Sequence, residues 1–299
     1  MQVHNLIDNQ ELMGSVISKH GYAPEHNYWY MVNMKDDTSE VLFWEYDGKG
    51  IVFLKHEDND IELISDILSP KEEQVDLFVK FLDFVYQEYE VDEVLVTFDS
   101  KSREDLINKV GDKYNISDPK RTFVSPVFNM KKWDSDLGGK SWKKMRNAKN
   151  SFLKNNNVQI VGPGKFTQEQ LINLIDEWAS RDKLEIKKEW AICFKNFVKN
   201  DFKGCDIIRI VSVRGVPCSI TSGWRIPNTN NYYSAIGVHN YKYQYLGEMA
   251  YIDDFACINL LKVDYVDMGG SDNEANLNFK KKFKPESLYT TYFMSVTKK

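Results

Sequence analysis

The chain is poor in the residues and motifs that mark several common classes of protein. It has four cysteines in 299 residues, and none are spaced as a CxxC pair. A disulfide framework or a cysteine zinc site is therefore not indicated. Its five histidines are scattered, and neither HExxH nor GxSxG occurs, which argues against a zinc protease or a serine hydrolase. The sequence predicts no metal site.

Long apolar runs are also missing. No stretch approaches the roughly 20 apolar residues that span a bilayer, and the N-terminus lacks the basic-then-apolar order of a signal peptide. We therefore expect a cytoplasmic protein without a transmembrane segment. The tripeptide GKS at 139–141 resembles the end of a P-loop, but the required first glycine is replaced by Asp134.

Charge is divided unevenly along the chain. The first half (residues 1–130) has 12 Lys/Arg and 26 Asp/Glu, a net charge of −14, whereas the second half (131–299) has 27 and 18, a net charge of +9. This favours an anionic ligand on the second half, although the two halves could instead attract each other. The length suits two domains, and a break in pattern near 134–139 predicts domains at 1–133 and 134–299.

The two halves show a similar order of elements. In the first half, strands flank a hairpin turn at 47–50, followed by a possible strand at 60–68, an amphipathic helix at 71–89, a strand at 93–99 and a closing strand at 122–130. In the second half, we predict helices at 141–156 and 166–183, a hairpin turning at 214–215, and a last strand at 286–296. Helices among mostly antiparallel strands indicate an α+β fold.

The stretch 232–285 carries the strongest functional signal. It reads strand, loop, helix (249–262), strand (263–270) and short helix (275–283), with Gln244 and Gly247 where the loop meets the first helix. It resembles the donor-binding half of GNAT-type N-acyltransferases. The resemblance implies two tandem GNAT-like domains with mixed, mostly antiparallel sheets, the first domain being degenerate. It also implies that Gln244 and Gly247 hold donor phosphate at a helix N-terminus.

The C-terminal lysines extend this resemblance. Residues 269–285 give a Gly-Gly turn and then a helix with Phe279 and Phe283 on its core side. This segment is similar to Fem-type aminoacyl-tRNA-dependent transferases and to the C-terminal domain of phosphatidylglycerol lysyltransferases. The resemblance implies that Lys280, Lys282 and Lys284 help to hold donor phosphate or the growing oxyanion. A solvated lysine face is the alternative.

A basic helix is predicted where the two domains join. Residues 131–165 contain nine Lys/Arg against two Asp, and the helix carries Lys143 and Arg146. It resembles the connecting helix of the same two families, and its charge density suits a polyanion. A simple amphipathic helix with a wet basic side is the alternative.

Candidates for acid–base chemistry follow from position in the chain. His239 ends the strand before the donor corner and is a candidate base, because amine attack on a carbonyl requires a proton acceptor. Asp253 and Asp254, on the next helix, could orient a cationic acceptor. Ser271 and Tyr243 are candidate acids or donors, and Lys282 is a catalytic candidate through the oxyanion role that the resemblance implies. Taken singly, each of these residues could equally be structural.

Three functions remain open from the sequence. The first is transfer of an aminoacyl group from aminoacyl-tRNA to an amine or hydroxyl of a small molecule or peptide. The second is an acyl-coenzyme A-dependent N-acetyltransferase. Glu248 and Met249 depart from the usual phosphate-binding pattern, which favours the first. The third is a non-catalytic module that binds nucleic acid or another anion. Donors would act as co-substrates, with no permanently bound cofactor, and the oligomeric state is not predicted.

Overall fold

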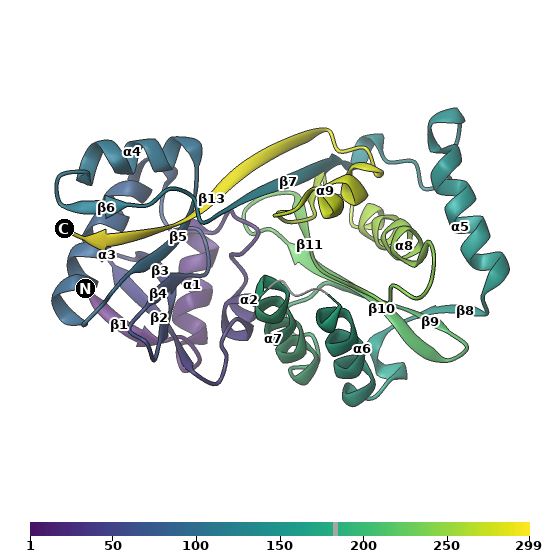
Figure 1. The fold of residues 1–299 in the computed structure, drawn as a ribbon, viewed down its shortest axis with the longest axis horizontal. Coiled ribbons are helices and arrows are strands. Elements are labelled where there is room, and N and C mark those ends of the chain that lie inside the picture. Colours follow the sequence, from purple (N-terminus) through teal and green to yellow (C-terminus); the bar gives the residue numbers. More distant parts are fainter. Residues whose placement is uncertain (182–184) are drawn as a thin grey trace.

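One mixed sheet runs through the molecule (Figure 1). The computed structural model describes residues 1–181 and 185–299. Within them the strands lie in the order β1-β2-β3-β4-β5-β13-β7-β12-β11-β10-β9-β8, with β6 beside β13. The strands are β1 (Gln2–Asn5), β2 (Ser39–Tyr46), β3 (Lys49–His56), β4 (Ile61–Leu63), β5 (Val94–Asp99), β6 (Tyr114–Ile116), β7 (Arg121–Asn129), β8 (Val158–Val161), β9 (Ile207–Val213), β10 (Val216–Arg225), β11 (Asn231–His239), β12 (Tyr265–Asp267) and β13 (Ser287–Lys298).

Nine α-helices cover this sheet within the described ranges. They are α1 (Gln10–His20), α2 (Tyr28–Asn33), α3 (Gln74–Glu88), α4 (Ser100–Val110), α5 (Lys143–Asn155), α6 (Gln168–Ser180), α7 (Glu185–Lys199), α8 (Leu246–Leu260) and α9 (Glu274–Lys281). Short 3-10 turns stand at Lys71–Glu73, Met130–Lys132, Lys140–Trp142 and Pro163–Lys165.

The internal repeat predicted from the order of elements is visible in the pairing. Helix α3 connects β4 to β5, which pair in parallel, and helix α8 connects β11 to β12 in the same way. The other strand pairs are antiparallel. The α+β class with a mixed, mostly antiparallel sheet is therefore confirmed.

The two halves exchange their last strands. β7, which ends the first half, pairs with β12 of the second half, while β13 pairs with β5 and β6 of the first half and also with β7. The long strands β7 and β13 run side by side from one half to the other (Figure 1). The last strand of each half therefore pairs with strands of the other half. The division at 133/134 stays a prediction.

Apolar periodicity explains which helix faces are buried. In α3, Phe78, Phe81 and Val85 are completely buried against β2, β3 and β5, and full burial of such a side chain contributes roughly 1.5–3 kcal/mol. Helix α6 begins after Thr167, whose hydroxyl accepts from the Gln170 N–H at 3.2 Å. Residues 182 and 183 of the predicted 166–183 helix lie outside the described residues.

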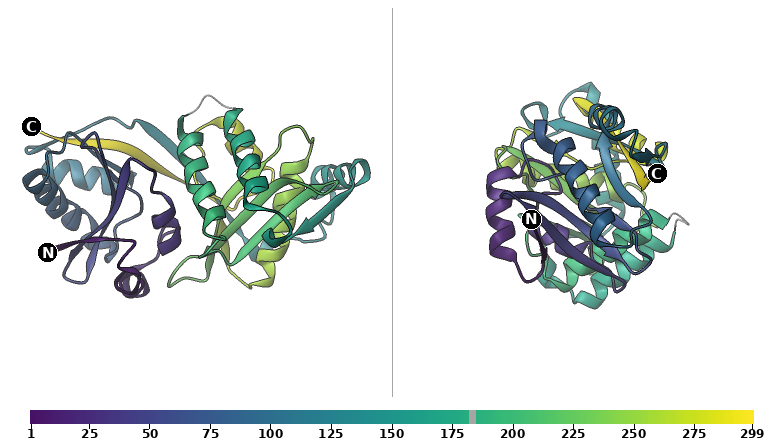
Figure 2. Two further views of the ribbon diagram at one scale, coloured as in Figure 1. Left: turned by 90° about the horizontal axis from the view of Figure 1, so that it is seen from below. Right: turned by 90° about the vertical axis from the view of Figure 1, so that its left-hand side faces the viewer.

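The helices of the second half lie on opposite faces of its strands. Helices α6 and α7 share one core with α1, α2 and strands of both halves, whereas α8 and α9 pack on the other face. Seen from below, α6 and α7 stand where the halves meet, with α5 at the far end (Figure 2). No helix among the described residues is long and apolar enough to cross a membrane.

Candidate functional site

A cavity of about 340 Å³ lies between the two halves. Its second-half wall is formed by α6, α7, β11, Tyr251 of α8, the turn after β12, α9 and β13. Its first-half wall is formed by α2, β5, β7 and the segments around residues 24–25 and 62–66. The volume is in the range of pockets for small ligands. Side chains or backbone from both halves are therefore available to one bound molecule.

Backbone hydrogen-bonding groups are open at the wall formed by β11. β12 pairs with β11 only from Asn231 to Tyr233, and within the described chain no strand lies on that edge beyond Tyr233. Ala235 and Gly237 on this unpaired stretch line the cavity. Alternate N–H and C=O groups of a strand point along the sheet toward such an edge. N–H donors there could stabilise negative charge on a carbonyl oxygen.

A buried lysine holds the turn that follows β12. Lys280 is 6% exposed, and its Nζ donates to the carbonyl oxygens of Met268, Gly269 and Gly270 at 3.0, 2.8 and 3.3 Å. Burial lowers the pKa of this amine to about 8, so the ammonium form still prevails at neutral pH. The three donors of an ammonium are thereby occupied. The expected phosphate-binding role of Lys280 stays a prediction, whereas its positioning of the turn is observed.

The turn is fixed on its other side by Asp267. This buried carboxylate accepts from the Gly269 N–H at 2.7 Å and from the Tyr289 hydroxyl at 2.6 Å. Gly269 has a φ of 73°, a left-handed conformation that glycine adopts without strain. The turn is thus held by a cation, an anion and β13 together.

Two carboxylates from the first half face this region. Glu25 lies between α1 and α2, Asp66 lies after β4, and both line the cavity. Burial, and for Glu25 also the nearby Asp66, raises the pKa of both carboxyls. Carboxyls with raised pKa values in a cleft are characteristic of functional sites.

His26 links the two backbone segments that carry these carboxylates. Its Nδ1 accepts from the N–H groups of Tyr22 and Ala23 at 3.0 and 3.2 Å, so the ring is neutral and Nε2–H donates to the Asp66 carbonyl oxygen at 2.8 Å. Burial lowers the pKa of His26 to about 4. The histidine thus fixes the segment that carries Glu25 relative to the one that carries Asp66.

The loop-to-helix corner that we predicted to hold donor phosphate is covered by Phe279 of α9. Tyr245 caps α8 with a φ of 67°, Gln244 is exposed, and Gly247 is buried in the first turn. A methyl group at Gly247 would lie 3.1 Å from the Phe279 ring, and Glu248 pairs with Lys282 at 2.7 Å. Phe279 and Phe283 both contact the core, as predicted. α9 therefore occupies the space over the start of α8.

The predicted acid–base residues are not part of the lining of the cavity. His239 stacks on Phe279, and burial lowers its pKa to about 4. Asp253 is bound by Arg209 at 2.7 Å. Asp254 is completely buried, accepts from the Ser234 hydroxyl at 2.8 Å and has its pKa raised by burial to about 7.

The remaining candidates are distributed over the second half. Arg146 donates to the carbonyl oxygens of Leu137 and Gly139 and so fixes the 134–139 segment. Lys143 is exposed on α5, and Lys284 lies 3.7 Å from the centre of the Trp142 ring. The Ser271 hydroxyl is buried, and Tyr243 is half-buried. These residues do not converge with His239 or with Asp253 and Asp254 at a single point, and their roles stay predictions.

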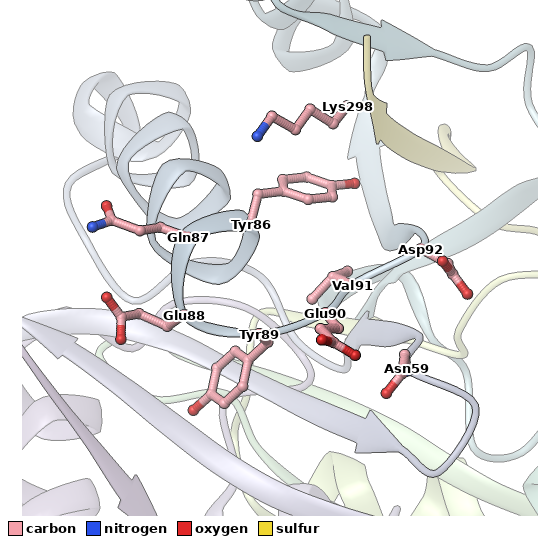
Figure 3. A pocket seen from close by; sticks show the side chains of 9 residues that line it. All are labelled: Asn59, Tyr86, Gln87, Glu88, Tyr89, Glu90, Val91, Asp92 and Lys298. Atoms are coloured by element: carbon pink, nitrogen blue, oxygen red, sulfur yellow. The ribbon is translucent and has the colours of Figure 1, made fainter.

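A second hollow, of about 550 Å³, lies on the first half at the end of α3. Glu88, Glu90 and Asp92 stand around it with their carboxylates pointing in different directions (Figure 3). Within the described ranges, no group of three or more potential ligand residues could hold a metal ion.

Comparison with known proteins identifies the fold. No protein-family model and no curated protein sequence matches the chain. L-PGS from Bacillus licheniformis matches with a TM-score of 0.66 and 13% identity over 95% of this chain and 90% of that chain. FemX matches with a TM-score of 0.63 and 10% identity over 99% of this chain and 97% of that chain. The tandem GNAT protein from the clavulanic acid biosynthesis pathway matches with a TM-score of 0.59 and 10% identity over 99% of this chain and 98% of that chain.

The chain has a tandem GNAT-like fold. The resemblance stated from the sequence is therefore confirmed at the level of fold. Identities of 10–13% do not carry a reaction from these proteins to this one. The function must be argued from the cavity itself.

Sequence reasoning missed Glu25, His26 and Asp66. They stand in the acidic first half, in segments without a motif, and Glu25 and Asp66 are brought together only by the fold. The negative net charge of that half was the only signal that pointed toward them.

Proposed function

We propose that the chain is an acyltransferase that moves an acyl or aminoacyl group onto an amine or hydroxyl acceptor inside the cavity. One observation carries the proposal. The open edge of β11 and the turn held by Lys280 face carboxylates with raised pKa values across a pocket of small-ligand size. Such a site combines donors for an oxyanion with a proton acceptor for the nucleophile.

The chemistry balances with the groups present. The acceptor nitrogen or oxygen bonds to the carbonyl carbon of the donor, and the bond from that carbon to the ester oxygen or thioester sulfur breaks. Glu25 or Asp66 takes the proton from the nucleophile. Tyr251 is placed to give one to the leaving atom, because its hydroxyl lies directly over Gly237 on β11.

We propose aminoacyl-tRNA as the donor. Phe279 covers Gly247, and the Glu248–Lys282 pair occupies the helix end, so the corner is poorly suited to a pyrophosphate. Lys143, Lys144 and Lys154 on α5 are exposed and form no ion pair in the part of the chain that the structure describes. Exposed lysines without an ion-pair partner can bind the phosphates of a nucleic-acid backbone.

An acyl-coenzyme A donor is the second candidate. It is favoured by the position of Gln244, which is exposed next to the N-terminal turn of α8, where a phosphate would gain from the helix dipole. The α5 lysines alone would also serve a non-catalytic anion-binding module, the third candidate.

Thermal unfolding with different ligands separates the three candidates, because a ligand that binds the native state raises the melting temperature. We expect total tRNA to raise it in a salt-sensitive manner, and coenzyme A and acetyl-coenzyme A to leave it unchanged. A shift with coenzyme A alone would overturn the tRNA donor. A response to tRNA without any transfer to an acceptor would favour the binding module.

A further inference from the structure

Glu25 stands apart from the other acids of the cavity. Glu62 lies 3.8 Å from His56, Asp66 accepts from Tyr22, Glu189 pairs with Arg121, and Asp272 accepts from Asn273. Across residues 1–181 and 185–299, the Glu25 side chain has no ion pair and no hydrogen bond to another residue. Glu25 is half-buried, and a partly desolvated carboxylate gains from a counter-charge, so this one is suited to a cationic ligand.

Two tyrosines beside Glu25 independently indicate a ligand. Tyr30 and Tyr233 line the cavity and expose 4% and 6% of their surface. Neither hydroxyl has a hydrogen-bond partner among the described residues, and neither is sealed in the core. Both tyrosine rings pack against Trp224, at 5.6 and 5.3 Å between ring centres, and the Trp224 Nε1–H donates to the carbonyl oxygen of Pro24, the residue before Glu25, at 2.8 Å. The three groups therefore belong to one part of the cavity. Both hydroxyls belong to the cavity wall and are available to hydrogen-bond a bound molecule.

We propose that Glu25, Tyr30 and Tyr233 form a subsite for the primary ammonium group of the acceptor. An ammonium has three N–H donors and no acceptor, and the subsite offers one carboxylate and two phenol oxygens. The same chain already holds the Lys280 ammonium with three oxygens. The inference rests on the proposed function, because it assigns the ammonium to the molecule that receives the acyl group.

Aromatic residues in the cavity wall indicate what the rest of the acceptor molecule is. Trp190 lies 6.4 Å from Tyr30 between ring centres, and Trp190, Trp178 and Phe194 also line the cavity. Aromatic faces stabilise a cation and pack against an alkyl chain. The acceptor class is therefore an aliphatic primary amine, either a small molecule or an amine-bearing side chain that enters the cavity.

Binding of n-pentylamine tests the subsite without any acyl donor. We expect ligand-observed NMR titrations to show saturable millimolar binding, at least about tenfold tighter than binding of 1-pentanol, because a charge-assisted hydrogen bond contributes that much. Glu25→Gln and Tyr30→Phe should each weaken the amine, Glu25→Gln by on the order of tenfold. Glu40→Gln, which removes an exposed acid outside the cavity, and Tyr28→Phe, also outside it, should bind as the wild type does.

Equal affinity in Glu25→Gln and wild type, equal affinity for the alcohol, or no saturable binding of the amine would each overturn the subsite. Melting temperatures of the variants show whether a loss reflects unfolding, and the two substitutions at different positions guard against a single misfolded variant. Because no donor is present, a negative result removes the ammonium subsite and leaves acyl transfer to be tested by itself.

Discussion

The ammonium of Lys280 donates to three carbonyl oxygens beneath the turn at 268–270. The resemblance to Fem-type transferases implied a phosphate ligand for this lysine, and that role stays a prediction. In the structure Lys280 supports a wall of the cavity. Lys281 and Lys282, the next residues on α9, are exposed.

Removing this lysine is expected to destabilise the protein. Lys280→Met leaves three carbonyl groups and the nearby Asp267 without their cation, which should lower the free energy of unfolding by about 3 kcal/mol. Urea denaturation measures the change. Lys281→Met, on the solvent side of the same helix, should differ from wild type by less than about 0.5 kcal/mol. Equal losses in both variants would contradict the role of Lys280.

The buried histidines predict how stability depends on pH. Burial lowers the pKa of His26 and of His239 to about 4. Between about pH 6.5 and about pH 4 the unfolded chain binds protons at these residues and the folded chain does not, so stability falls as the pH falls. Each contributes up to about 3 kcal/mol.

Comparison with His26→Gln isolates this effect. The wild type should exceed the variant in free energy of unfolding by more at about pH 7 than at about pH 4.5, because only the wild type loses the His26 contribution on acidification. Urea denaturation at the two pH values measures the difference. A constant difference would show that His26 titrates as it does in an unfolded chain.

Most elements of the second half could be predicted because their signals are local. The hairpin at 214–215 and the helix–strand–helix order after Gly247 follow from turn residues and apolar spacing. Helix α7 was missed although Phe194, Phe197 and Val198 are buried at helical spacing, so its signal was available. The pair of acids Glu25 and Asp66 could not be predicted in this way, because their proximity depends on contacts between segments about 40 residues apart.

We expect helix α5 to contact a polyanion. Lys143→Glu combined with Lys154→Glu should weaken tRNA binding, and the slope of log affinity against log salt should become shallower by about two charges. Filter binding at several salt concentrations measures both. Lys101→Glu with Lys199→Glu, at exposed positions away from α5, makes the same change in net charge. An equal effect of both pairs would show that only overall charge matters.

At the scale of the whole molecule, the exchange of β7 and β13 makes each half depend on the other. β13 pairs with β5 and β7, both from the first half, and residues of both halves share a core around Met31, Phe197 and Trp224. The cavity requires both as well, since Glu25 and Lys280 come from different halves. We therefore predict that the two halves do not fold independently of each other.

This dependence can be tested with fragments. Residues 1–133 and 134–299, produced separately, should each lack a cooperative thermal transition by circular dichroism, because each exposes an unpaired strand and half of a shared core. Mixing or co-expressing the two should restore the transition. A cooperative transition of 134–299 alone would show that β13 does not need its first-half partners.

Transfer itself is the most direct test of the central claim, that acyl transfer takes place in the cavity between the halves. We would measure the rate at which the protein moves labelled aminoacyl groups from total aminoacyl-tRNA to n-pentylamine. The account predicts transfer that ribonuclease treatment of the donor abolishes and that Glu25→Gln slows by on the order of a hundredfold, whereas Glu40→Gln, outside the cavity, leaves the rate unchanged. An undiminished rate in Glu25→Gln, or no transfer at all, would contradict it.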